Sequence, residues 1–97
     1  MKHDVKNDKL TIYLEGQLNS FNAEQTEKDI NQIVNNEKFS KLALDFNDLV
    51  YISSAGLRII MALKQRYNDI VLTKVGDDIN DIFTMVGFQN ILTIERK

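Results

Sequence analysis

The chain has 97 residues, of which 43% are hydrophobic and 27% charged, and its 12 basic and 14 acidic side chains give a formal charge of −2. This length and composition fit one folded globular domain and exclude a disordered chain. The near balance of charge argues against nucleic acid as a partner, because phosphate binding needs a basic patch. The absence of cysteine excludes disulfides and thiolate metal sites.

The N-terminal segment predicts neither export nor membrane insertion. Residues 1–10, MKHDVKNDKL, are polar, and no window approaches the roughly 20 apolar residues that span a bilayer. We therefore expect a cytoplasmic protein with no direct membrane insertion. Nothing in the sequence marks a linker or a repeat, so residues 1–97 are expected to form a single domain, which we expect to be monomeric.

The first half of the chain predicts a hairpin, a helix and a short strand. Residues 9–18 alternate apolar and polar side chains, as a strand with one buried face does, and Val5 is expected to begin a preceding strand. Apolar residues at helical spacing predict an amphipathic helix over residues 22–35. Residues 41–46, KLALDF, indicate a short buried strand.

The second half continues the alternation of helices and strands. The predicted elements are a helix from Ser54 to about Tyr67, a strand over residues 69–75, a helix over residues 77–86 that stops at Gly87, and a strand over residues 90–95. The resulting order implies an α/β fold: a mainly parallel sheet of four to five strands that begins with a β-hairpin and is packed with about three helices.

The chain offers few groups for catalysis. His3 is the single histidine, and its place near the N-terminus suits it poorly to act as the base of a serine hydrolase. The four glycines match neither a P-loop nor a dinucleotide fingerprint. An enzyme is therefore disfavoured, and we expect no cofactor.

Two clusters of acidic residues are candidates for a cation site. Asp77, Asp78 and Asp81 are better explained as residues at the start of a helix, where negative charge suits the dipole. Asp45 and Asp48 are a second candidate, against the commoner alternative of a solvated loop. No metal site is expected.

The segment YISSAGLR, residues 51–58, carries two serines where a strand gives way to a helix. Ser53 or Ser54 is expected to be the helix N-cap, accepting backbone N–H bonds that have no partner within the helix. Ala55 and Gly56 leave the backbone bare, which would suit close approach by another protein. A phosphoryl group here would face the positive end of the helix dipole. The residues alone leave an ordinary cap and a phosphorylation switch both open.

The helix that Ser54 begins is expected to carry the partner surface. At 100° per residue, its core side is predicted to consist of Leu57, Ile60, Leu63 and Tyr67. Its opposite side is predicted to consist of Ala55, Arg58, Ile59, Ala62 and Arg66. Ile59 would then be an exposed apolar anchor among small and basic residues, the alternative being that it packs against a neighbouring loop.

Three segments resemble the STAS domain of the bacterial anti-sigma factor antagonist family. EGQLNSFNA at residues 15–23 is similar to the G-x-L-D segment of that family, and LALDFNDLVYISSAGLR at residues 42–58 is similar to its central motif. FTMVGFQNIL at residues 83–92 is similar to its closing helix and strand. The resemblance covers nearly the whole chain and implies a single STAS domain over residues 1–97.

The resemblance also implies a function in which the catalytic machinery belongs to a partner. In the family, the serine two places before the glycine of the motif is phosphorylated by a kinase that is also the anti-sigma factor, and this position is Ser54. The unphosphorylated form binds the kinase and releases a sigma factor, phosphorylation switches binding off, and a serine phosphatase resets the switch. This chain departs from the family at Ser53 and Asn19, where many members have Asp.

The expected partner surface is formed by Asn19, Ser53, Ser54, Ala55, Gly56, Arg58, Ile59 and Ala62. An alternative function is that of a non-switching STAS subunit in a membrane lipid-transport complex of the ABC type, held against its ATPase by the same helix. The presence of Ser54 in a single-domain chain favours the regulatory function.

Overall fold

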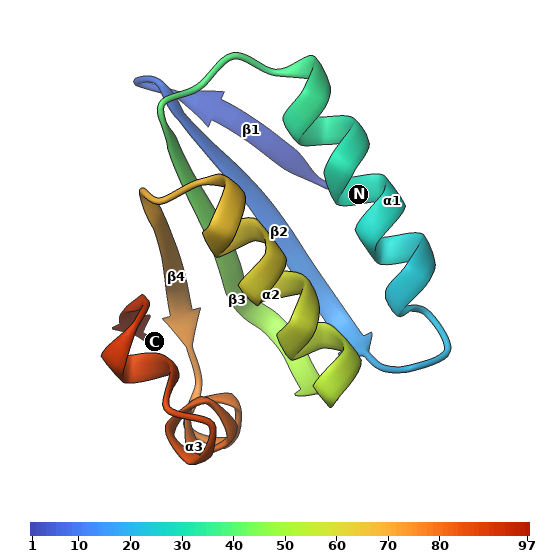
Figure 1. Cartoon of the computed structure of the whole chain (residues 1–97), viewed down its shortest axis with the longest axis vertical. Coiled ribbons are helices and arrows are strands. Elements are labelled where there is room, and N and C mark those ends of the chain that lie inside the picture. The colour runs from blue at the N-terminus through green and yellow to red at the C-terminus, as the bar shows by residue number, and fades with distance from the viewer.

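The computed structural model describes all 97 residues, and the elements follow the predicted order. The strands are β1 (His3–Lys6), β2 (Lys9–Leu18), β3 (Lys41–Ile52), β4 (Ile70–Val75) and β5 (Thr93–Arg96), and the helices are α1 (Ala23–Asn36), α2 (Ser54–Arg66) and α3 (Asp77–Met85) (Figure 1). A short 3-10 helix, η1 (Phe88–Asn90), precedes β5. The predicted α/β fold with an initial hairpin and three helices is confirmed.

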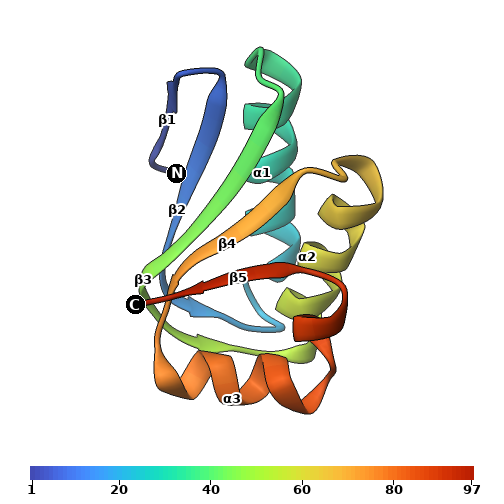
Figure 2. The same cartoon turned by 90° about the vertical axis from the view of Figure 1, so that its left-hand side faces the viewer.

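The five strands form one sheet in the order β1-β2-β3-β4-β5. β1 pairs with β2 antiparallel, and every later pair is parallel. Each crossover leads to the next strand in the same direction, and right-handed crossovers then place successive helices on one side of the sheet. Figure 2 shows α1 and α2 side by side on that side, with α3 across one end.

A single apolar core joins the sheet to the helices. Alternate residues of β2 face this core, and they pack there with buried side chains from every helix and from β3 and β4. The most completely buried of these side chains are Leu10, Ile12, Ile30, Leu42, Leu44, Phe46, Ile60, Leu72, Val75 and Phe83. None of the helices is both long enough and apolar enough to cross a membrane.

β3 is twice as long as predicted, because the second half of β2 also pairs with it through two register shifts. Asp48 consequently lies in the same strand as Asp45, and the solvated loop expected for them is wrong. Asp45 is only 6% exposed, accepts the N–H of Asn47 at 2.9 Å and lies 3.8 Å from the Nζ of Lys74. A buried carboxylate needs such partners. Asp45 and Lys74 therefore form a structural ion pair that the sequence pattern did not predict.

Tyr13 of β2 links the two strands of the hairpin through its hydroxyl, which donates to Oδ2 of Asp4 at 2.9 Å. This hydrogen bond, together with desolvation and the nearby negative charge, raises the pKa of Tyr13 above its ordinary value of 10.0. Asp4→Asn is expected to move the Tyr13 titration to lower pH in an ultraviolet difference titration of the native protein, with Tyr13→Phe identifying the signal.

The pKa shift also fixes the direction of a change in stability. The pKa of Tyr13 is higher in the folded protein than in the unfolded chain. Its contribution to the stability of the fold is therefore complete below a pH of about 10 and is lost as the pH rises through the folded pKa. An unchanged Tyr13 titration in Asp4→Asn would show that the hydrogen bond does not cause the shift.

Candidate functional site

The candidate site lies where β3 ends and α2 begins. Ser53 is the N-cap residue, with extended backbone angles of φ −96° and ψ 176°. Its N–H donates to the carbonyl of Leu18 at 2.8 Å, and its own carbonyl accepts the N–H of Leu57 at 3.0 Å. Ser54 is the first residue of the helix, and its side chain is exposed. The end of β2 thus holds the start of α2 in place.

The two serines differ in what their hydroxyl groups can reach. The Oγ of Ser53 is buried without a hydrogen-bond partner, and the side chain makes no cap bond. The expected side-chain cap is therefore wrong, although Ser53 does occupy the cap position. The Ser54 hydroxyl faces solvent, and the first turn of α2 contains no acidic residue. Negative charge added at Ser54 would meet the positive end of the helix dipole.

Gly56 is required by packing. A Cβ at this position would lie 2.7 Å from Cγ1 of Ile52 and 2.8 Å from Cγ of Leu18, closer than carbon atoms pack. The missing side chain therefore lets α2 start directly against the ends of β2 and β3. The prediction that Gly56 lies bare at the partner surface is wrong, because the residue is buried.

The buried face of α2 is rotated from the predicted one. Ile59 is only 5% exposed and Ile60 is also buried, whereas Leu57 is half-buried. The prediction of Ile59 as an exposed anchor is wrong. The physical reason is that α2 packs against α1 as well as the sheet, which widens its apolar stripe toward α1. Ile59 accordingly lines a small hollow between the two helices, together with Glu27 and Ile30 of α1.

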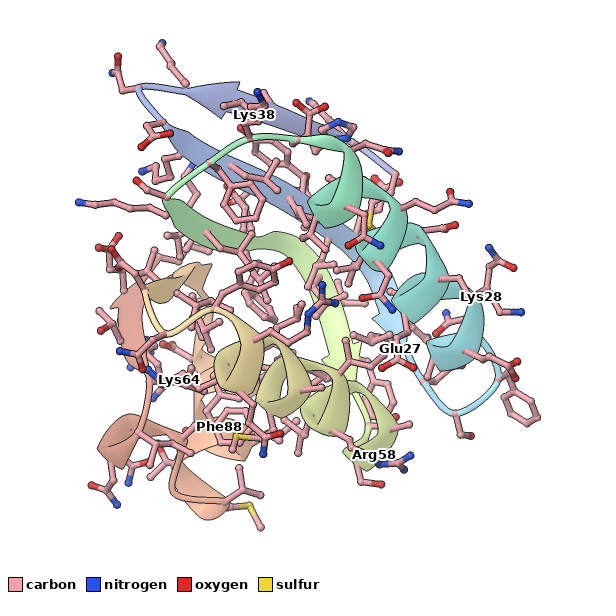
Figure 3. All side chains as sticks on the ribbon, turned by 45° about the horizontal axis from the view of Figure 1, so that its top comes forward. Glu27, Lys28, Lys38, Arg58, Lys64 and Phe88 are labelled. Atoms are coloured by element: carbon pink, nitrogen blue, oxygen red, sulfur yellow. The ribbon has the colours of Figure 1, made fainter.

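Several predicted partner residues do meet at one surface, a hollow that we call the α1–α2 groove. It has a volume of about 480 Å³ and is lined by Ser20, Ala23, Glu24, Glu27, Ala55, Arg58, Ile59 and Ala62. Figure 3 shows Glu27 on the α1 side and Arg58 on the α2 side, while Lys28 points away from the groove. Ala55, Arg58 and Ala62 are thus brought together beside Ser54, with Ile59 at the base.

Asn19 organises the loop between β2 and α1. Its Oδ1 accepts the N–H of Phe21 at 2.9 Å and the N–H of Asn22 at 3.1 Å, and Oδ1 of Asn22 accepts the N–H of Asn19 at 2.9 Å. This loop presents Phe21, which is 97% exposed. Phe21 was not predicted as a site residue, although an aromatic residue within the polar run NSFN was an available signal.

Comparison with protein families matches residues 2–97 to the STAS domain. The chain belongs to the STAS domain family. This STAS domain is 35% identical over 90 residues to BtrV of Bordetella bronchiseptica, whose name assigns it provisionally as an anti-sigma factor antagonist. The match covers 88% of this chain and 76% of BtrV. The family resemblance of the three segments is confirmed.

Solved structures share the fold of this STAS domain. A Thermotoga maritima protein with the same provisional assignment matches with a TM-score of 0.88 and 17% identity, over 99% of this chain and 86% of its own. The anti-sigma factor antagonist SpoIIAA in its unphosphorylated form matches with a TM-score of 0.70 and 15% identity, over 96% of this chain and 84% of its own. At these identities the structures establish the fold alone.

Proposed function

We propose that this STAS domain is an anti-sigma factor antagonist: it binds an anti-sigma factor and so releases a sigma factor, in the cytoplasm. Support comes from the 35% identity to BtrV, which is named for that role. Within the chain, the observation that carries the proposal is the solvent-facing hydroxyl of Ser54 at the start of α2.

Phosphorylation of Ser54 is the proposed switch. The anti-sigma factor would be the serine kinase, holding ATP so that Oγ of Ser54 attacks the γ-phosphorus while the hydroxyl proton leaves and ADP departs. A serine phosphatase would hydrolyse the phosphoserine and restore binding. Between the two neighbouring serines, Ser54 is favoured because the Oγ of Ser53 is buried.

The added charge should act on binding and leave the fold intact. A phosphoserine carries about −1.5 to −2 charge at neutral pH and would sit at the positive end of the α2 dipole, which tolerates it. The same charge and bulk would stand between the partner and the surface formed by Ala55 and Arg58. Phosphorylation is therefore expected to lower the affinity for the partner without lowering the stability of the fold.

A labelling experiment tests the proposed function. The serine-kinase anti-sigma factors of the source organism would each be purified and incubated with the chain and ATP, and the phosphate located by mass spectrometry. We expect at least one kinase to bind the chain and label Ser54. Ser54→Ala should abolish labelling, whereas the matched control Ser53→Ala should be labelled normally because that hydroxyl is buried.

Two outcomes would count against the proposal. If every kinase failed to bind and label the wild-type chain, the antagonist function would be wrong. If a kinase bound but labelled Ser53 in place of Ser54, the antagonist function would stand and the assignment of the switch would be wrong.

A further inference from the structure

Phe21 is an exposed aromatic side chain on an ordered support. It is 97% exposed, and the backbone N–H groups of Phe21 and Asn22 are both held by Oδ1 of Asn19. The Asn22 side chain also donates to the carbonyl of Gln17 at 2.7 Å, which fixes the loop to the end of β2. A large apolar group held in place loses little conformational freedom on binding, and aromatic residues are common interface anchors.

The α1–α2 groove lies directly beside this loop. Ser20 and Ala23, which flank Phe21 in the chain, both line it. Beyond Ala62 the space between the helices continues as a second hollow lined in part by Arg66, whose guanidinium donates to Oδ1 of Asn31 at 3.0 Å and to Oδ1 of Asn35 at 3.3 Å. The groove therefore lies at the end of the two helices where Phe21 and the start of α2 are found.

The shape and charge of the groove define what it can accept. Three alanines, Ala23, Ala55 and Ala62, line it, so that another backbone can approach closely. The α1 wall carries Glu27 and Glu24, and Oε1 of Glu24 lies 3.6 Å from Nζ of Lys28 in an exposed ion pair. The α2 wall carries Arg58, which makes no hydrogen bond or ion pair within the chain (Figure 3). An occupant must therefore present an apolar strip with basic groups along one side and an acidic group along the other.

We propose that Phe21 and the α1–α2 groove form the docking surface for an amphipathic helix of the anti-sigma factor, an inference that rests on the proposed function. The apolar stripe of the helix lies along the alanines, its basic side chains face Glu24 and Glu27, and an acidic side chain pairs with Arg58. Phe21 inserts into the partner beside one end of the helix. The opposite charges of the two walls fix the orientation of the helix.

This arrangement also explains how a phosphate at Ser54 would act. Ser54 adjoins Ala55 and precedes Arg58 by one helical turn, so its phosphate stands at the end of the groove where α2 begins. There it competes for the guanidinium of Arg58 and repels the acidic side chain of the docked helix.

Calorimetric titration of the chain with the kinase that labels Ser54 tests the docking surface. Phe21→Ser is expected to weaken binding by about tenfold or more, as loss of an interface anchor does. The matched control is Met85→Ser on α3, which removes an apolar side chain that is 84% exposed and should leave affinity unchanged. Glu27→Lys should also weaken binding, whereas the same change of charge in Glu95→Lys, at an exposed residue of β5 on the opposite edge of the sheet from β1, should not.

The form of the occupant is tested by cross-linking. Replacing Glu24, on the α1 wall of the groove, with the photoreactive p-benzoylphenylalanine should cross-link the kinase within one of its helices, and a cross-link to a strand or extended loop would overturn the helix assignment. Wild-type affinity of Phe21→Ser, with Ser54 still labelled, would overturn the docking surface and leave the proposed function standing. Failure of every kinase to bind the wild-type chain would instead refute the proposed function.

Discussion

Phe83→Ala is expected to lower the free energy of unfolding by about 3 to 5 kcal/mol, the usual cost of removing a buried aromatic ring. Phe83 of α3 is completely buried. Its ring meets that of Phe46 edge-on at a centroid distance of 5.5 Å and stacks on that of Phe88 at 5.3 Å. The truncation therefore removes the contacts that hold α3 to β3 and η1, and it leaves a cavity among them.

Urea unfolding followed by circular dichroism measures this loss. Met85→Ala on the same helix is the matched control, because its side chain projects into solvent and the change should stay within about 0.5 kcal/mol. Equal losses in the two variants would show that α3 does not pack through Phe83.

Gly56→Val should cost about 3 kcal/mol of folding free energy, at the upper end of the range for overpacking. The first added carbon already lies within 3 Å of Ile52 and Leu18, and both of those side chains belong to the core. This overlap is relieved only if the start of α2 moves away from the sheet, and the same movement displaces Ser54. We therefore expect slower phosphorylation at temperatures where the variant is still folded.

The control for Gly56→Val is Gly76→Ala, where the nearest atom to the new Cβ is Cδ of Lys97 at 4.0 Å. Its thermal midpoint should stay close to that of the wild type. If Gly56→Val proved as stable as this control, the close packing of α2 against the strand ends would be wrong.

Local patterns were sufficient to predict most of the fold. The alternation over residues 9–18 and the helical spacing over residues 22–35 depend on which face of one element is buried, and that face was predicted correctly. The length of β3 was not predictable in this way. Residues 47–52 are mixed in polarity, and they are extended because β2, distant in sequence, pairs with them.

The candidate site was predicted only in part, because some of its features also depend on contacts between elements that are distant in sequence. Ser54 could be singled out because a strand-to-helix junction is visible in the sequence. The burial of Ile59 depends on a second helix, α1, whose position the pattern of α2 does not contain. Gly56 was misread because the clash that a side chain there would make with Leu18 has no local signature, and the exposure of Phe21 depends on side-chain bonds within its loop.

The order of strands in the sheet has a consequence for synthesis on the ribosome. Each strand pairs with the strand that precedes it in the chain, so every new strand emerging from the exit tunnel finds its neighbour already made. A nascent chain that has emerged as far as Arg66 holds β1, β2, α1, β3 and α2, with both walls of the groove and Ser54 in place. Growth then proceeds at a single edge as β4 and β5 are added. The unpaired edge of β3, which could recruit another nascent chain, is exposed only until β4 arrives.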